Sequence, residues 1–177
     1  TEFILMFQAD GIIDQKDIFK LLNAHKKYKN SFIVSPILFD KEQNVSANSG
    51  NFPEKYLYKT PIVIDGDICA ETVLGSIIMF KREDIIDIGL YDENLFLYFL
   101  DDDLCKRIRD KKKAVIQVKD ARAIHEHGQI KVRNSIKRTF LRHFNFTFDE
   151  LYYFYKIKKH ERLINELSNK VPKYFLK

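Results

Sequence analysis

Apolar and polar positions alternate along the start of the chain in a pattern that predicts an α/β fold. Residues 3–7 are a continuous apolar run, which is typical of a strand covered on both faces. After a polar break, apolar side chains recur at helical spacing over residues 18–28, and Asp14 or Asp17 is placed to cap this helix. A short strand over residues 32–35 is expected to stop at the proline that follows. Strand, loop, helix and strand make one α/β unit.

Residues 40–61 interrupt this pattern with a cluster of Asn, Ser, Gly and Pro, which predicts a long loop. A loop of that length inside a compact domain is usually functional or mobile. Beyond it, Ile62–Ile64 and Ile68–Val73 read as short strands on either side of Asp65-Gly66-Asp67. That turn signal predicts a hairpin.

The pattern from residue 77 to residue 125 predicts further strands and two helices. A short helix over residues 82–88 is closed by Gly89. A second helix opens with the acidic run at 101–103, and its apolar positions recur at helical spacing on one face. The strands are expected at Ile77–Phe80, Ala114–Val118 and Ala121–His125.

Beyond Arg133 the pattern is wholly helical. Ile136, Phe140 and Phe144 line one side of a first helix, and this spacing predicts that they pack against the rest of the domain. Thr147 with Glu150 three residues later predicts a capping box that opens a second helix. We therefore divide the chain into an α/β domain over residues 1–130 and a helical extension over residues 131–177.

The composition is that of a folded chain with the length of one domain. The 177 residues are 45% apolar and include only 6 Gly and 4 Pro, which argues against disorder. No apolar stretch has the length of about 18 residues that a transmembrane helix needs. Cys69 and Cys105 could form a disulfide on parity alone, but we expect two free core thiols. Neither has the closely spaced Cys or His neighbours of a zinc site.

The net charge of +5 is unevenly distributed. Residues 1–130 carry 18 Lys and Arg against 21 Asp and Glu, whereas residues 131–177 carry 12 against 4 and hold 10 of the 24 aromatic residues. A basic and aromatic segment favours an anionic, partly apolar partner, such as a membrane surface or a lipid-linked substrate. Nucleic acid is the competing interpretation, which we set aside because the aromatic residues fall at helical core spacing.

Three polar groups could carry chemistry. Asp10 directly follows a strand, at the sheet edge where ligands bind in open α/β sheets, and it suits a divalent ion; the alternative is a turn aspartate. The three adjacent carboxylates at 101–103 oppose the helix dipole, but they also repel one another, which indicates that at least one accepts a proton. His125 could ligate a metal or be structural, and its surroundings do not have zinc-protease spacing.

Several pieces from Gly75 to Gly128 occur in a specific order. They are Gly75-Ser76 before an apolar strand, LYDE at residues 90–93, FLYFLDDDLC at residues 96–105 and ARAIH at residues 121–125. This order resembles the C-terminal half of family 2, GT-A-type glycosyltransferases, especially the rhamnosyltransferase-like branch. Residues 1–10 resemble the strand that runs into the DxD-type metal motif of that family, so the resemblance covers roughly residues 1–130.

The resemblance implies an α/β, GT-A-like (Rossmann-like) mixed sheet flanked by helices. It also implies that the N-terminal part of the domain, the βαβ half that holds the nucleotide base, is missing here. The helical extension would then follow the metal, base and acceptor side.

The resemblance also implies roles for individual residues. Asp10 and His125 correspond to ligands of a divalent metal, Mg²⁺ or Mn²⁺. Asp101 corresponds to the general base on the acceptor hydroxyl, and Asp102 or Asp103 takes this role if the register slips. An inverting transfer needs such a base and a cation that neutralises the leaving diphosphate. We expect donor or acceptor contacts from Gln8, Gly75, Ser76, Arg82, Asp103 and Arg107.

Two departures from the family pattern keep an alternative open. Gln8 stands at the first position of the DxD motif, and Leu100 replaces the glutamate of the usual Glu-Asp pair. The alternative is a non-catalytic domain that binds a sugar or a partner. For the enzyme we expect a nucleotide-diphosphate sugar donor, a glycan or lipid-linked acceptor and an anionic membrane surface, and no nucleic acid. We expect the enzyme to be cytoplasmic and peripheral on the inner face of the plasma membrane. Its expected role is in bacterial cell-envelope polysaccharide synthesis.

Overall fold

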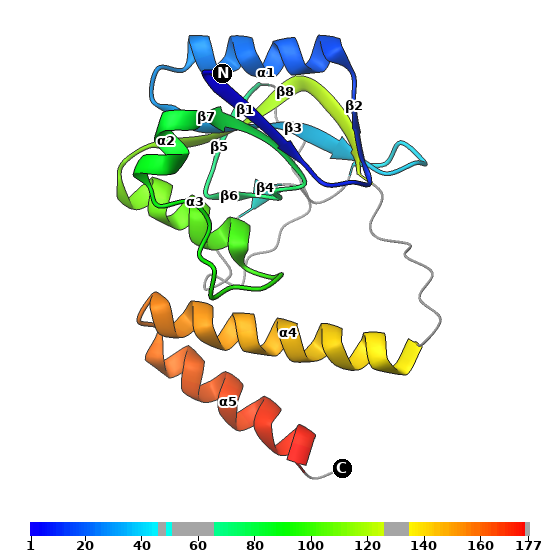
Figure 1. Ribbon diagram of the computed structural model, residues 1–177, viewed down its shortest axis with the longest axis vertical. Helices are drawn as coiled ribbons and strands as arrows, with labels where there is room; N and C mark the ends of the chain where they lie inside the picture. Colours follow the sequence, from blue (N-terminus) through cyan, green and yellow to red (C-terminus); the bar gives the residue numbers. More distant parts are fainter. Residues whose placement is uncertain (46–48, 51–65, 126–134, 176–177) are drawn as a thin grey trace.

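The computed structural model describes residues 1–45, 49–50, 66–125 and 135–175, which form a mixed sheet with helices on both faces and two further helices beside it (Figure 1). The sheet has the strand order β1-β7-β3-β8-β2, with β5 paired to β8. β3 and β8 run parallel, and the other pairs in this sheet are antiparallel. The strands are β1 (Phe3–Phe7), β2 (Gly11–Ile13), β3 (Ser31–Phe39), β5 (Ile68–Ala70), β7 (Ile77–Lys81) and β8 (Ala114–His125).

The helices of the α/β domain cover the two faces of this sheet. Helix α1 (Gln15–Lys27) lies on one face, where Leu21 and Ala24 join a buried cluster with strand residues such as Val34. Helices α2 (Arg82–Asp87) and α3 (Leu100–Asp110) lie on the other face. Leu104 and Ile108, one helical turn apart, are both fully buried there. The predicted α/β fold with a mixed sheet flanked by helices is therefore confirmed.

The cap predicted for α1 is absent. Asp14 is the N-cap residue, but its side chain makes no capping hydrogen bond. Asp17 is buried one turn into the helix, where its carboxylate accepts hydrogen bonds from the Lys20 ammonium at 2.7 Å and from the Arg122 backbone N–H at 3.2 Å. Asp17 thus ties α1 to β8 instead of closing the end of its own helix.

Three strands differ from the expectations. β1 pairs with β7 at the edge of the described sheet. Ile4 and Met6 pack against the buried cluster on one face, and Phe3 and Leu5 pack against the cluster on the other. The strand is covered on both faces as predicted, but its residues are only half-buried, and Phe7 is exposed. β3 continues through Pro36, which pairs with Val118, and the register shifts directly after this pair. Proline has no N–H to donate, and a local irregularity accommodates it without ending the strand. β8 is one strand where two were expected.

The region between β3 and β7 is described in part. β4 (Ser49–Gly50) and β6 (Thr72–Val73) form a two-stranded sheet, and β5 pairs with β8. Ile62–Ile64, the first arm of the predicted hairpin, lies outside the described residues. Cys69 on β5 is exposed and Cys105 is buried, and both are free thiols. The expectation of two free thiols is met, but only Cys105 is a core residue.

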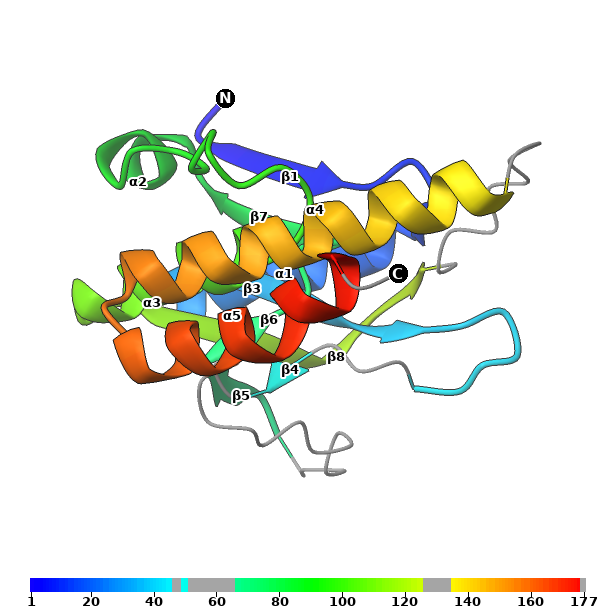
Figure 2. The ribbon, with the colours of Figure 1, turned by 90° about the horizontal axis from the view of Figure 1, so that it is seen from below.

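The extension consists of α4 (Ser135–Lys156) and α5 (His160–Phe175), which lie below the α/β domain in Figure 1 and side by side in Figure 2. Thr147 and Glu150 lie inside α4, so the predicted capping box is wrong. The predicted packing of the first half of α4 is also wrong, because Ile136, Phe140 and Phe144 are 81%, 60% and 55% exposed. None of the described helices is long and apolar enough to cross a membrane.

The second half of α4 packs on the loop that precedes α3. Tyr153 and Phe154 are fully buried and pack with Leu95, Phe99 and Leu100. Asp149 accepts hydrogen bonds from the backbone N–H groups of Phe96, Leu97 and Tyr98 at 3.0, 2.8 and 2.8 Å. These contacts fix the segment that leads into α3, where the acidic run lies.

Candidate active site

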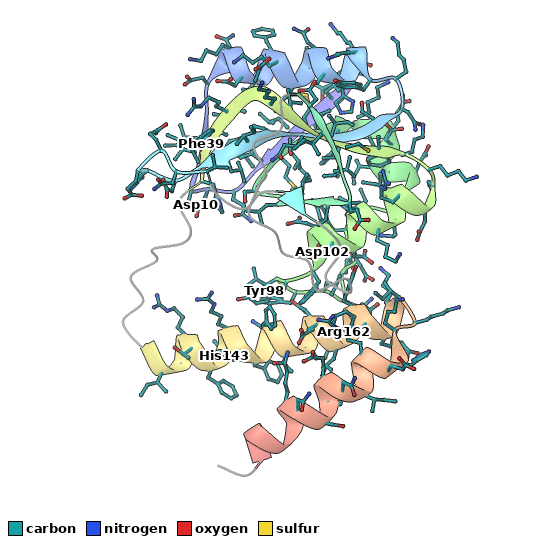
Figure 3. The ribbon with its side chains drawn as sticks, turned by 180° about the vertical axis from the view of Figure 1, so that it is seen from behind. Asp10, Phe39, Tyr98, Asp102, His143 and Arg162 are labelled. Atoms are coloured by element: carbon teal, nitrogen blue, oxygen red, sulfur yellow. The ribbon has the colours of Figure 1, made fainter. Side chains whose placement is uncertain are left out.

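Four of the predicted site residues converge where β1 ends. Gln8 and Asp10 follow β1, Ser76 precedes β7, and His125 ends β8. The strand pairing explains the convergence, because Phe7 pairs with Ile77 and Gly11 pairs with His125. The N–H of Gln8 donates to the carbonyl oxygen of Ser76 at 2.8 Å and extends the first of these ladders. Figure 3 shows Asp10 at this end of the sheet.

His125 is the centre of this group. Its side chain is only 6% exposed, and its Nε2 lies 3.0 Å from Gln8 Oε1 and 3.5 Å from Asp10 Oδ1. Its Nδ1 lies 3.3 Å from Ser76 Oγ. The Ser76 hydroxyl can donate or accept, so it can serve either tautomer of the imidazole. When it accepts the Nδ1 proton, the Nε2 lone pair is directed toward Asp10 and Gln8.

These residues fit a divalent cation that shares its coordination with a ligand. In the described ranges, no three His, Cys, Asp or Glu side chains form a group that could hold a metal by themselves. Mg²⁺ and similar hard cations are commonly held by one or two carboxylates together with phosphate oxygens of a substrate. Asp10, His125 and the Gln8 amide oxygen supply such an incomplete set of ligands.

The Asp101 carboxyl occupies space that is free because Gly75 has no side chain. Its Oδ2 accepts a hydrogen bond from the Gly75 N–H at 2.8 Å, and a Cβ on Gly75 would lie 2.0 Å from Asp101 Oδ1. Burial raises the pKa of the Asp101 carboxyl to about 6, although the Gly75 N–H acts in the opposite direction. A carboxylate with a pKa close to the working pH is suited to accept a proton.

The dipeptide Gly75-Ser76 links Asp101 to the group of residues around His125. Gly75 holds Asp101 through its N–H, and Ser76, which is fully buried, holds His125 through its hydroxyl. A candidate base and a candidate metal ligand are thus bound by adjacent residues in the turn before β7. All of these positions were predicted from the sequence, and the structure brings them together.

The other predicted site residues have different surroundings. Asp102 accepts a hydrogen bond from the Thr72 hydroxyl at 2.9 Å beside Asp101. Asp103 is buried between Arg107 at 2.8 Å and Lys156 at 2.5 Å. Arg107 also donates to the carbonyl groups of Ile88 and Leu90, so this pair connects α3 to its neighbours. We therefore no longer propose Asp103 and Arg107 for substrate contacts.

Arg82 is also separate from this cluster. It is exposed at the start of α2, and β7 runs between it and Ser76, so it lies at the opposite end of that strand. The five residues of β7 span about 17 Å at the usual rise of a strand. An Arg82 contact with a donor held at Asp10 and His125 is therefore dropped from our proposal.

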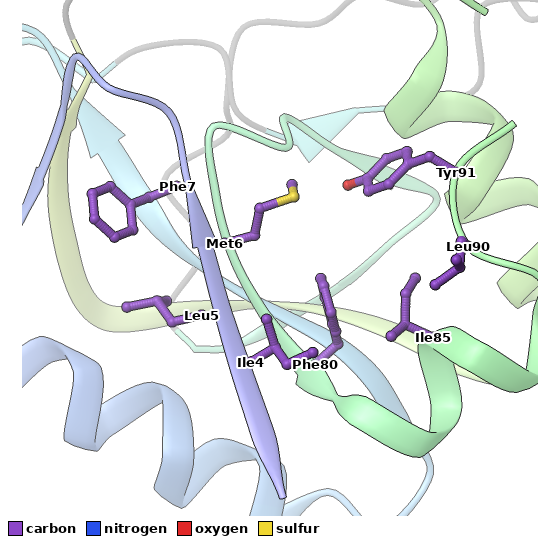
Figure 4. Close-up of a pocket in the computed structure, with 8 residues that line it drawn as sticks. All are labelled: Ile4, Leu5, Met6, Phe7, Phe80, Ile85, Leu90 and Tyr91. Carbon is purple, nitrogen blue, oxygen red and sulfur yellow. The ribbon is translucent and has the colours of Figure 1, made fainter. Parts of the chain in front are cut away.

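Two features near the site were not predicted. An open apolar depression of about 450 Å³ lies beside β1, and the Tyr91 hydroxyl is buried at it without a hydrogen-bond partner in the described part of the chain (Figure 4). Burial, followed by the nearby Asp101 carboxylate, raises the pKa of Tyr91. The second unpredicted feature is the bonding of Asp149 to the loop before α3. A single acidic residue inside a helical pattern does not indicate such a role. The depression is lined by Ile4, Leu5, Met6, Phe7, Phe80, Ile85, Leu90 and Tyr91.

Replacement of Gly75 by alanine tests the close approach to Asp101. The new methyl group must displace the carboxyl, and overpacking of this kind typically costs about 1–3 kcal/mol of unfolding free energy. We also expect the raised pKa of Asp101 to return toward its ordinary value as the side chain moves to solvent. Urea denaturation and NMR titration of the Asp101 carboxyl would measure the two effects.

Gly50→Ala is the matched control, because a Cβ at Gly50 has no atom within 4 Å. If Gly75→Ala behaves like Gly50→Ala in both measurements, Gly75 does not make room for Asp101.

The mixed sheet and its flanking helices give the α/β domain a GT-A-like fold. The structure of GalNAc-T7 with UDP, GalNAc and Mn²⁺ is similar, with a TM-score of 0.53 and 12% sequence identity, over 71% of this chain and 28% of that one. The chain thus corresponds to less than a third of the length of this neighbour. No protein-family model matches the chain, and no curated protein matches its sequence.

Proposed function

We propose that this chain carries the metal, base and acceptor side of a glycosyltransferase. The reaction moves a sugar from a nucleotide-diphosphate donor to an acceptor hydroxyl, with inversion at the sugar carbon. The Gly75-Ser76 turn is the observation that carries this proposal, because it holds a carboxyl of raised pKa and the buried His125 side by side. The structural neighbour was crystallised with UDP, a sugar and Mn²⁺, which supports the class of donor and cofactor.

Each of these residues has a task in the proposed transfer. Asp101, ionised above its pKa of about 6, accepts the proton of the acceptor hydroxyl as this oxygen attacks the sugar carbon. Asp10 and His125 would hold Mg²⁺ or Mn²⁺, with Gln8 beside them. Such a cation, when bound, neutralises the charge that develops on the leaving diphosphate. Ser76 orients the imidazole, and Gly75 keeps Asp101 in place through its N–H.

The finer assignments rest on the sequence resemblance. Membership of family 2, its rhamnosyltransferase-like branch and a role in bacterial cell-envelope polysaccharide synthesis come from the ordered match over residues 75–128. A glycan or a lipid-linked saccharide as acceptor, and a cytoplasmic place at the membrane, belong to the same proposal. The structural neighbour shares the fold only.

A second candidate function is that of a domain that binds a sugar and does not catalyse its transfer. The observation in its favour is the 3.0 Å contact between Gln8 Oε1 and His125 Nε2, because this contact occupies the nitrogen that a metal would use. In this alternative Asp101 would accept a hydrogen bond from a sugar hydroxyl and take no proton.

Turnover by the full-length protein separates the two candidates. With Mn²⁺ and a panel of UDP-, dTDP- and GDP-sugars, the enzyme should release nucleoside diphosphate from at least one donor, and EDTA should stop the release. Saturable binding of a donor or sugar by calorimetry, with no release from any member of the panel, would favour the binding domain.

A further inference from the structure

The first half of α4 is uncovered by the described part of the chain. All the side chains from residue 136 to residue 144 are exposed, in contrast to the second half of the helix, where Tyr153 and Phe154 are fully buried. An α-helix that exposes large apolar side chains over more than two turns usually marks an interaction surface. This half of α4 is therefore the strongest unassigned feature of the molecule.

The exposed apolar side chains of α4 form one stripe. Ile136, Phe140, Phe144 and Phe148 follow one another at a spacing of four residues, and the rings of Phe140 and Phe144 stack with centroids 6.1 Å apart. Tyr155, two turns further, is exposed on the same side. We call these five side chains the outer face of α4.

A different side of α4 faces the α/β domain. Asp149, Tyr152 and Lys156 make hydrogen bonds to residues of the loop at 92–98, and they recur at helical spacing about a third of a turn from the outer face. The outer face is thus directed away from the loop that leads to Asp101. In Figure 3 this loop, marked by Tyr98, lies between α4 and the sheet.

The charges around the outer face have one sign. Between residues 136 and 160, every exposed side chain that carries a charge is cationic or a histidine. The two acidic side chains of this segment are buried. Asp149 binds the loop N–H groups, and Glu150 pairs with Lys170 on α5. The exposed basic residues are Lys137, Arg138, Arg142, Lys158 and Lys159.

We propose that the outer face of α4 binds the surface of an anionic lipid bilayer, with the helix lying in the interface. An apolar stripe on a helix segment whose exposed charges are all cationic, on the stripe at Lys137 and on the polar side at Arg138 and Arg142, matches the acyl and headgroup layers of such a membrane. A second copy of the chain would bring like charges together, and a nucleic acid would leave the Phe and Ile side chains unburied. This inference deepens the membrane location that is part of the proposed function, and it is tested without any measurement of sugar transfer.

Vesicle flotation of the full chain tests the proposal. Protein should float with vesicles of phosphatidylcholine and phosphatidylglycerol and remain behind with phosphatidylcholine alone. Phe140→Ala with Phe144→Ala should lower the affinity at least about tenfold, because each buried aromatic side chain contributes strongly. Arg138→Gln with Arg142→Gln should lower it by about thirtyfold, the product of two lost charges.

Matched controls lie on α1, on the opposite face of the sheet. Phe19 is 54% exposed there, close to the 55% of Phe144, and Lys26 and Lys29 are exposed beside it. Phe19→Ala and Lys26→Gln with Lys29→Gln should leave flotation unchanged. The proposal is overturned if no vesicle retains the protein, or if the α1 controls lower retention as much as the α4 variants. It is also overturned if Phe140→Ala with Phe144→Ala abolishes self-association, measured by sedimentation without lipid, while flotation is unaffected.

Discussion

Asp101→Asn in the full-length protein should lower the rate of sugar transfer by about 10²–10⁴, the usual contribution of a general base. The asparagine can still accept the Gly75 N–H, so the local structure should be retained. Donor binding should therefore change little, because the base acts on the acceptor. The rate of the unsubstituted protein should rise with pH through about 6, where Asp101 ionises. Initial rates across pH, with donor affinity measured separately, would show this.

The same substitution should stabilise the protein above pH 6. The pKa of Asp101 is about 6 in the folded state, against an ordinary value of 3.8, because burial opposes the charged form. A raised pKa favours the folded state at low pH, and this advantage is lost as pH rises from about 4 through about 6. The difference of about 2 pKa units corresponds to roughly 3 kcal/mol. Asp101→Asn should recover up to that amount at neutral pH and nothing below about pH 4.

Urea denaturation at several pH values measures this difference, with Asp110→Asn as the control. Asp110 lies at the end of the same helix and is largely exposed, so its substitution should have little effect at any pH. Equal turnover by Asp101→Asn and the unsubstituted protein would remove Asp101 as the base. An Asp101→Asn protein that is no more stable at pH 8 than the parent would contradict the raised pKa.

Substitution of either candidate metal ligand should strongly weaken the binding of Mn²⁺. Asp10→Asn and His125→Ala should each weaken Mn²⁺ binding in the presence of UDP by about 100-fold or more, because the protein supplies few ligands here. Gln8→Glu should strengthen binding, since glutamate has the length of glutamine and places a carboxylate oxygen where the amide oxygen now lies, 3.0 Å from the imidazole. A purely structural cluster would show no gain from this change.

Isothermal titration calorimetry with the full-length protein provides the affinities. Asp14→Asn is the control, because Asp14 is a largely exposed carboxylate four residues beyond Asp10 that contacts Lys16. If Asp10→Asn binds Mn²⁺ as tightly as Asp14→Asn does, the metal is held elsewhere.

Much of the α/β domain could be predicted from the sequence because its elements have clear apolar periods. The helices α1, α2 and α3 and the strands β1 and β7 lie at or close to the expected residues. Where the strands end was harder to predict. β3 passes through Pro36 because its irregular parallel pairing with β8 leaves the proline nitrogen without a required partner. β2 was missed because three residues after a polar turn carry no period of their own.

The site was predictable to the extent that it lies in the ordered motif. The positions of Asp10, Ser76 and His125 follow from strands whose ends meet, and Asp101 comes from the start of α3, which the acidic run predicts. Roles that depend on tertiary contacts were not predictable. Arg107 and Asp103 form an ordinary (i, i+4) pair in sequence, and only the structure shows that Lys156 and two backbone carbonyls complete their network.

The extension shows the limit of periodicity most clearly. Ile136, Phe140 and Phe144 have the spacing of a core stripe, but the α/β domain contacts a different side of the helix. Spacing predicts that a face is apolar and does not identify what covers it. The exposure of this face supports the membrane partner that the charge of the extension already favoured.

The central claim is that Asp10 and His125 form the metal site of a sugar-transferring enzyme. A crystal of the full-length protein with UDP and Mn²⁺, measured at the manganese absorption edge, tests this claim most directly. The account predicts one anomalous peak within about 2.0–2.3 Å of an Asp10 carboxylate oxygen and of His125 Nε2, bridged to the diphosphate. A peak that contacts neither residue, or UDP bound with no peak at all, would contradict it.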